Sequence, residues 1–141
     1  MDTAEPFLVL IVEDESSIAA VLAAFVAGLG YVPLVAPHGA AALELARARW
    51  PALVLTDQMM PLLSGSRLIA ALHAEADAHG HRMPSIILMS AGSLRIAEQA
   101  GADMVLPKPF DLEQVEALLE RFLGTPQQPG ADRGGQSLSD P

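Results

Sequence analysis

Five polar residues of this sequence each follow a short apolar run, and their side-chain types suit one kind of chemistry. They are Glu13, Asp14, Asp57, Ser90 and Lys108. Clustered carboxylates raise one another's pKa unless a cation neutralises them, and Mg²⁺ prefers a few oxygen ligands together with water and phosphate oxygens. A lysine binds a phosphoryl oxygen as a point charge, and a carboxylate can act as a nucleophile. This set predicts a Mg²⁺-assisted phosphoryl acceptor.

Each of these residues also has an ordinary structural explanation. Glu13 and Asp14 can favour a helix N-terminus electrostatically, and Asp57 can begin a turn. Ser90 can be a strand-end serine, and Lys108 a solvated lysine between prolines. Taken singly, most of these explanations are the better ones. The joint occurrence of the five residues at successive strand ends favours the functional interpretation.

The elements that must position these residues are strands and helices in alternation. Continuous apolar runs between polar residues indicate strands buried on both faces. The expected strands are residues 7–12, 32–36, 53–56, 85–89 and 104–106. Helices are expected between them, including one over residues 94–100 and a last one from Asp111 to about Leu123. The alternation predicts an α/β fold: a doubly wound, five-stranded parallel sheet with helices on both faces.

Two helices carry more detailed expectations. Ser16 or Ser17 is expected to cap the first helix. Its apolar face is expected to comprise Ile18, Val21, Leu22, Phe25, Val26 and Leu29. The polar stretch 75–82 is expected to connect the third helix to the fourth strand. We interpret its His79 and His81 as polar residues of an exposed turn rather than as metal ligands.

Composition bounds the function classes. The net charge of −9, with eight basic residues in 141, argues against nucleic-acid binding through a basic surface. The absence of cysteine excludes disulfides and thiolate metal sites. The apolar stretch 18–36 contains Gly28, Gly30 and Pro33, so we expect no membrane span, and no signal peptide is evident. We expect a cytoplasmic protein with one domain over residues 1–123. Residues 124–141, rich in Gly, Pro and Gln, are expected to be a disordered tail or linker stub.

Five sequence stretches together resemble the response-regulator receiver family over residues 7–123. They are VLIVEDE (9–15), LVLTDQMMP (53–61), IILMSA (86–91), GAD (101–103) and PKPF (107–110). The resemblance implies a flavodoxin-like sheet with strand order 2-1-3-4-5. It also implies a two-component signalling role, with a histidine kinase or phosphotransfer protein as phosphodonor and an output target that the sequence does not name.

The same resemblance assigns roles to the residues of the phosphoryl-acceptor site. Asp57 would be the phospho-acceptor. Asp14 and the backbone carbonyl of Met59 would hold Mg²⁺ together with Asp57, and Glu13 would assist through water. The side chains of Met59 and Gly92, two residues after Asp57 and Ser90, cannot hydrogen-bond an attacking water. We therefore expect a long-lived phosphoryl state.

Ser90 and Lys108 would bind the phosphoryl group, but three features near them depart from the family pattern. Val105 occupies a position where many receivers carry an aromatic ring that reports phosphorylation. The separation of 18 between Ser90 and Lys108 is short by about one helical turn, which implies an altered signalling face. Ser64 replaces a common acidic residue, which we expect to be a mild change.

The leading interpretation is a phosphorylatable switch, in a single-domain protein, that turns over no external substrate. One alternative is a receiver-like adaptor that acts without phosphorylation. The other is a Mg²⁺-dependent aspartyl phosphatase, but haloacid-dehalogenase-type phosphatases carry D-x-D after the first strand. This chain has Glu13-Asp14 there, with its candidate nucleophile after the third strand.

Overall fold

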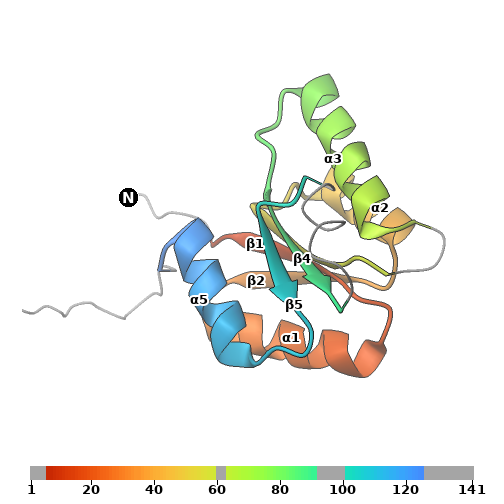
Figure 1. Ribbon diagram of the computed structural model, residues 1–141. Coiled ribbons are helices and arrows are strands. Elements are labelled where there is room, and N and C mark those ends of the chain that lie inside the picture. The colour runs from red at the N-terminus through yellow and green to blue at the C-terminus, as the bar shows by residue number, and fades with distance from the viewer. Residues whose placement is uncertain (1–5, 60–62, 92–100, 126–141) are drawn as a thin grey trace, which may run out of the picture.

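The computed structural model describes residues 6–59, 63–91 and 101–125, which form five strands and four helices (Figure 1). The strands are β1 (Leu8–Val12), β2 (Val32–Ala36), β3 (Leu53–Asp57), β4 (Ser85–Ser90) and β5 (Met104–Pro107). The helices are α1 (Ser16–Gly28), α2 (Gly39–Ala48), α3 (Gly65–His79) and α5 (Leu112–Leu123). The predicted helix over residues 94–100 lies outside the described residues. None of the described helices is long and apolar enough to cross a membrane.

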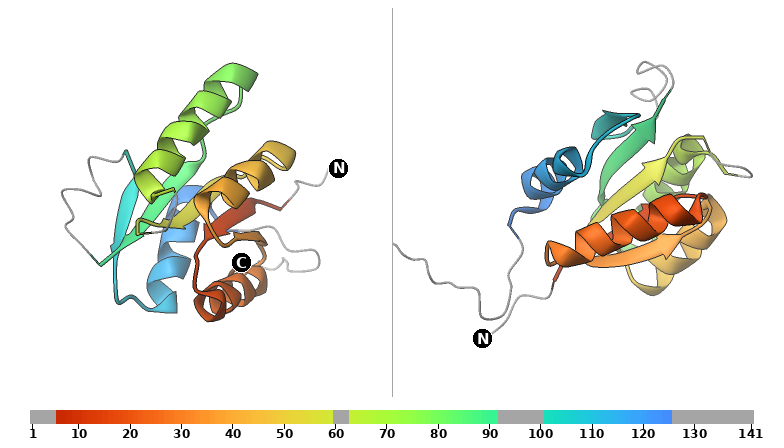
Figure 2. Two further views of the ribbon diagram at one scale, coloured as in Figure 1. Left: turned by 90° about the vertical axis from the view of Figure 1, so that its right-hand side faces the viewer. Right: turned by 90° about the horizontal axis from the view of Figure 1, so that it is seen from below.

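All strand pairs are parallel, and the order β2-β1-β3-β4-β5 confirms the predicted doubly wound sheet. Helices α1 and α5 cover one face and α2 and α3 cover the other (Figure 2). Alternate residues of β1 supply the two cores: Val9 and Ile11 pack toward α1 and α5, whereas Leu10 and Val12 pack toward α2 and α3. This alternation explains why a buried parallel strand is apolar throughout.

The strand register brings the ends of the strands to one edge of the sheet. Val12 pairs with Thr56, Asp57 with Met89, and Ser90 with Pro107. The residues that directly follow Val12 and Pro107 therefore emerge beside Asp57. In an open parallel sheet this carboxyl edge is where ligands bind.

Helix α1 differs from its prediction in two respects. The N-cap is Glu15, without a side-chain cap hydrogen bond, so the predicted serine cap is wrong. The most buried stripe is Ala19, Leu22 and Val26. Ile18 and Val21, predicted to face the core, are 37% and 55% exposed. The small side chain of Ala19 lets the helix approach the sheet on that stripe, which turns the two larger residues outward.

Helix α3 continues to His79, so the prediction that a connection starts at residue 75 is wrong in its first half. Ala76 in the last turn is buried, and Gly80 ends the helix in the left-handed region at φ 68°. Arg47 of α2 pairs with Glu75 at 2.9 Å. The last turn is therefore stabilised by tertiary contacts rather than by a continued apolar pattern.

Helix α5 begins as predicted. The Asp111 side chain accepts a hydrogen bond from the Gln114 backbone N–H, and the Gln114 side chain accepts one from the Asp111 N–H. This reciprocal pair satisfies two backbone donors that the first helical turn leaves free. It fixes the N-cap of α5 three residues after Lys108.

Candidate functional site

Three carboxylates meet at the carboxyl edge of the sheet. Glu13, Asp14 and Asp57 each offer an oxygen, and these oxygens lie within 4.8 Å of one another. Glu13 and Asp57 are only 3% and 5% exposed, whereas Asp14 is exposed. Asp57 is the last residue of β3, and Glu13 and Asp14 are the first two residues after β1, so the buried sheet fixes where their backbone emerges.

Lys108 supplies the positive charge of this site. Its Nζ lies 2.9 Å from Asp57 Oδ2, in a hydrogen-bonded ion pair whose carboxylate is nearly fully buried. The Lys108 backbone N–H donates to the Ser90 carbonyl at 2.9 Å, which continues the β4–β5 ladder by one residue. The ladder thus aims the lysine at the end of β3.

Glu13 is the least satisfied group of the site. Its Oε2 accepts a hydrogen bond from the Glu15 N–H at 3.2 Å. Its Oε1 is buried and has no hydrogen-bond partner among the described residues. Burial raises the pKa of Glu13, and the negative charge of Asp57 raises it further, against the opposing effects of the Glu15 hydrogen bond and Lys108. A buried carboxylate oxygen without a partner, beside two more carboxylates, fits a hard cation such as Mg²⁺.

The loop after Asp57 is held by contacts that our sequence reasoning missed. The Gln58 carbonyl accepts from the Gly65 N–H at 3.1 Å, and its side chain exchanges hydrogen bonds with Ser66. A Cβ on Gly65 would lie 2.8 Å from the Asp57 carbonyl oxygen and 2.7 Å from Leu88 Cδ1. Glycine is therefore required here by close approach, which the position of Gly65 before a helix could have suggested.

The other residues that the sequence singled out lie at strand ends, within β5 and at the start of α3, apart from Gly92. Ser90 is buried at the end of β4, and the Met59 side chain is 77% exposed. Val105 is half-buried against the α2–α3 core. Ser64, predicted to be a mild departure, caps α3 by accepting from the Arg67 N–H. Gly92 lies outside the described residues.

A groove of about 830 Å³ runs beside Lys108, between α1 and the start of α5. Its wall is mostly apolar, and its larger apolar members are Ile18, Val21, Leu22, Pro109, Phe110 and Leu112. The outward turn of α1 exposes Ile18 and Val21 to this groove. Exposed apolar side chains of this kind, next to a charged site, are typical of a protein-binding surface.

Comparison with known proteins places this geometry in a family. A model of the response regulator receiver domain matches residues 9–120. Response regulator Rre1 of Synechocystis sp. is 33% identical over 138 residues, which cover 95% of this chain and 58% of that protein. The chain spans about half the length of the curated relatives that it matches.

Two solved structures extend the comparison. The receiver domain of sensor histidine kinase PA1611 from Pseudomonas aeruginosa, with magnesium in its active-site cleft, has a TM-score of 0.73 and 25% identity. The match covers 85% of this chain and 99% of that one. The receiver domain of Ssk1 from Saccharomyces cerevisiae, solved in complex with the histidine phosphotransfer protein Ypd1, has a TM-score of 0.77 and 22% identity. The match covers 86% of this chain and 91% of that one, and it shows a similarity of fold. The chain belongs to the response regulator receiver domain family.

Proposed function

We propose that Asp57 accepts a phosphoryl group from a histidine kinase or a phosphotransfer protein, with Mg²⁺ bound alongside. The observation that carries this proposal is the grouping of three carboxylates with one lysine, 2.9 Å from Asp57, at the carboxyl edge of the sheet. In the proposed step, a carboxylate oxygen of Asp57 attacks the phosphorus of phosphohistidine. The N–P bond breaks, its electron pair stays on the imidazole, and an aspartyl phosphate forms.

The residues around Asp57 prepare it for this step. Lys108 offsets the charge of the buried carboxylate, and it would bind a phosphoryl oxygen of the transferred group; its ion pair with Asp57 supports this role. Ser90 lies at the end of the next strand, where its hydroxyl would donate to another phosphoryl oxygen. The contacts between Gln58 and the start of α3 hold the backbone on the far side of Asp57.

Asp14, Asp57 and the Met59 carbonyl would hold Mg²⁺, and Glu13 would contact it through water. When bound, the ion neutralises the clustered carboxylates and the charge that develops on the transferred group. The buried Oε1 of Glu13 supports this assignment because it otherwise has no partner among the described residues.

The phosphodonor is a protein in this proposal, and the apolar groove beside Lys108 supports it. A groove lined by Ile18, Val21 and Phe110 suits the apolar side of a partner helix that brings its histidine to Asp57. We further propose that this receiver domain acts as a switch in the cytoplasm, processes no external substrate and does not itself bind nucleic acid.

Intact-mass analysis tests the chemistry directly. The chain is incubated with Mg²⁺ and a small phosphodonor such as acetyl phosphate, as wild type and as Asp57→Asn. We expect an adduct of about 80 Da on the wild type, absent in Asp57→Asn and absent when EDTA removes the metal. Asp77→Asn, on the exposed side of α3, is the matched control and keeps the adduct.

Two outcomes contradict the proposal. A wild type that takes up no phosphate favours a phosphorylation-independent adaptor. Steady release of inorganic phosphate from added phosphomonoesters favours an aspartyl phosphatase.

A further inference from the structure

A second cluster of polar side chains lies at the opposite end of the sheet from Asp57. It surrounds a hollow of about 330 Å³ whose walls are Arg47, Trp50, Glu75, His79 and His81. The continuation of α3 to His79 creates this cluster, because it places Glu75 and His79 one helical turn apart on the same side. Along β3 alone, Leu53 and Asp57 are separated by about 13 Å, so the cluster is distinct from the phosphoryl site.

Glu75 divides its two oxygens between different neighbours. Its Oε2 accepts from Arg47 Nε at 2.9 Å and lies 2.9 Å from Arg47 Nη2. Its Oε1 lies 3.6 Å from His79 Nε2, which is too long for a good hydrogen bond. Two ligands of one tetrahedral zinc ion lie about 3.3 Å apart, so this spacing is close to that of a shared ion. The Arg47 hydrogen bond also lowers the pKa of Glu75.

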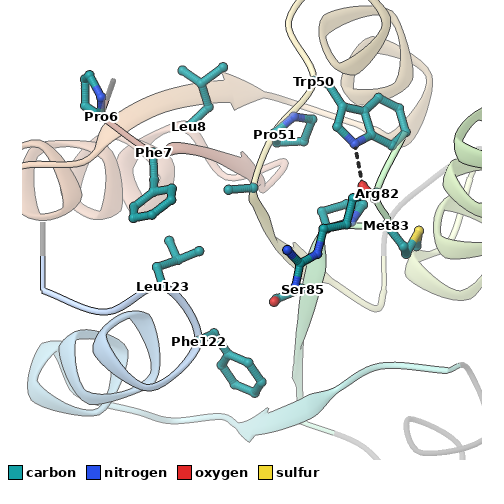
Figure 3. A pocket seen from close by; sticks show the side chains of 12 residues that line it. Pro6, Phe7, Leu8, Trp50, Pro51, Arg82, Met83, Ser85, Phe122 and Leu123 are labelled. Carbon is teal, nitrogen blue, oxygen red and sulfur yellow. Dashed lines mark hydrogen bonds between the residues drawn. The ribbon is translucent and has the colours of Figure 1, made fainter. Parts of the chain in front are cut away.

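His81 is held beside this pair by the indole of Trp50. The two rings stack with centroids 4.4 Å apart and planes inclined by 16°. The indole is itself fixed, because its Nε1–H donates to the Arg82 carbonyl at 2.8 Å (Figure 3). The ring centroids of His79 and His81 are 6.1 Å apart. Imidazoles that share one ion have ring centres about 5–6 Å apart.

We propose that Glu75, His79 and His81 bind a divalent transition-metal ion of the zinc type. Two imidazoles and a carboxylate are the ligands that zinc takes in open sites, where water fills the fourth position. They discriminate against Mg²⁺, which the oxygen-only site at Asp57 suits. Among the described residues, only Glu13, Asp14 and Asp57 already hold three ligand atoms within 4.8 Å. In the second site, Glu75 and His79 therefore have their ligand atoms close together before the ion binds. His81 completes the site when its ring turns to direct a nitrogen at the ion.

The bound ion would join the last turn of α3 to the connection that enters β4. Arg47 would orient Glu75 from outside the ligand set, and Trp50 would limit the positions of His81. Such outer contacts typically contribute tenfold to a hundredfold to metal affinity.

Trp50 is the only tryptophan in the chain, so its emission reports on this site alone. The experiment titrates Cu²⁺, a paramagnetic quencher, into the tag-free full chain at pH 7.5 with excess Mg²⁺ to occupy the acidic site. We expect saturable quenching that Zn²⁺ reverses by competition. Zn²⁺ binding is measured independently by calorimetry.

Three single variants, one double variant and one control decide the outcome. Glu75→Gln, His79→Gln and His81→Gln should each weaken binding at least about tenfold. His79→Gln is the cleanest, because His79 does not stack on Trp50. His73→Gln, an exposed histidine earlier on α3, should bind as the wild type does. The proposal is overturned if quenching is not saturable, or if the double variant His79→Gln/His81→Gln, shown to be folded by circular dichroism, binds Zn²⁺ as tightly as the wild type.

Discussion

The two ends of the parallel sheet hold their glutamates in opposite ways. At the carboxyl end, Glu13 is buried beside Asp57, and this burial raises the pKa of Glu13. One oxygen of Glu13 has no hydrogen-bond partner among the described residues. At the amino end, Glu75 is bound by Arg47, and this contact lowers its pKa. The first carboxylate is destabilised as an ion by its surroundings, and the second is stabilised.

The glycines differ in the same way. Gly65 beside Asp57 has no room for a Cβ, whereas a Cβ on Gly28, at the end of α1 away from the site, would meet no atom within 4 Å apart from its chain neighbours and the backbone of its own helix. The carboxyl end therefore has a carboxylate oxygen without a partner, on Glu13, and a closely packed glycine, Gly65. The amino end has a paired carboxylate, on Glu75, and a loosely packed glycine, Gly28. At the carboxyl end the proposed Mg²⁺ site therefore contains an unsatisfied buried carboxylate in a rigid setting, whereas at the amino end the proposed zinc site contains a carboxylate that Arg47 already orients.

Replacement of Lys108 is expected to have the largest effect, because it removes the cation that the carboxyl end holds beside Asp57. In Lys108→Met the buried Asp57 loses the cation at 2.9 Å and the transferred phosphoryl group loses a stabilising charge. We expect phosphorylation by acetyl phosphate to slow by about 10²–10³-fold, measured as the rate of adduct formation by mass spectrometry. Arg82→Met removes an exposed cation at the amino end and should leave this rate unchanged. Equal slowing in both variants would mean that overall charge, and not the position of Lys108, controls the reaction.

The glycine pair is expected to show the next largest effect. Gly65→Ala forces a Cβ against the Asp57 carbonyl and Leu88, so we expect a loss of about 1–3 kcal/mol in the free energy of unfolding. Gly28→Ala should stabilise the protein by about 0.4–1 kcal/mol, because it lowers the entropy of the unfolded chain without a clash. Urea denaturation measures both. If Gly65→Ala were as stable as the wild type, the backbone around Gly65 would be able to move away from the Asp57 carbonyl at little cost, which would contradict the prediction.

The sheet and the acidic cluster were predictable from the sequence for a common physical reason. Strands buried on both faces must be apolar throughout, so the first polar residue after each run marks its carboxyl end. Parallel topology then brings those ends together. The proximity of Asp57 and Lys108, 51 residues apart, followed from this rule without any knowledge of side-chain contacts.

The features that escaped prediction depend on contacts between segments distant in sequence. The last turn of α3 carries no continued apolar pattern, and its pairing with Arg47 is visible only in three dimensions. The exposure of Ile18 and Val21 depends on how α1 rotates against the sheet. The stacking of Trp50 on His81 joins residues that are 31 positions apart, so the sequence around the two histidines does not indicate it.

Met59 allows a smaller test within the carboxyl end. Its side chain is 77% exposed and offers no hydrogen bond to a water that attacks the aspartyl phosphate. Met59→Asn supplies an amide there, so we expect phosphate loss to become several-fold faster, measured by the decay of the adduct after removal of the donor. Met59→Leu is the matched apolar control and should decay at the wild-type rate. An unchanged or slower rate in Met59→Asn would contradict the expected long-lived phosphoryl state.

The smallest expected effects come from the glutamates themselves, and they have opposite signs. The raised pKa of Glu13 means that the folded protein binds this proton more tightly than the unfolded chain does. Its stabilising contribution is therefore complete below pH 4.5, the unperturbed value, and is lost as pH rises through the folded pKa. For Glu75, whose pKa is lowered, the contribution is complete above pH 4.5 and is lost as pH falls.

Urea denaturation in EDTA, from acid to neutral pH, separates these two contributions. At pH 7 we expect Glu13→Gln to be more stable than the wild type and Glu75→Gln to be less stable. Mg²⁺ should then stabilise the wild type more than Glu13→Gln, because the ion compensates the charge that the variant lacks. If the free energy of unfolding changed in the same direction in both variants, the two carboxylates would have similar effects on stability. The charge of Glu13 would then no longer support the proposed cation site.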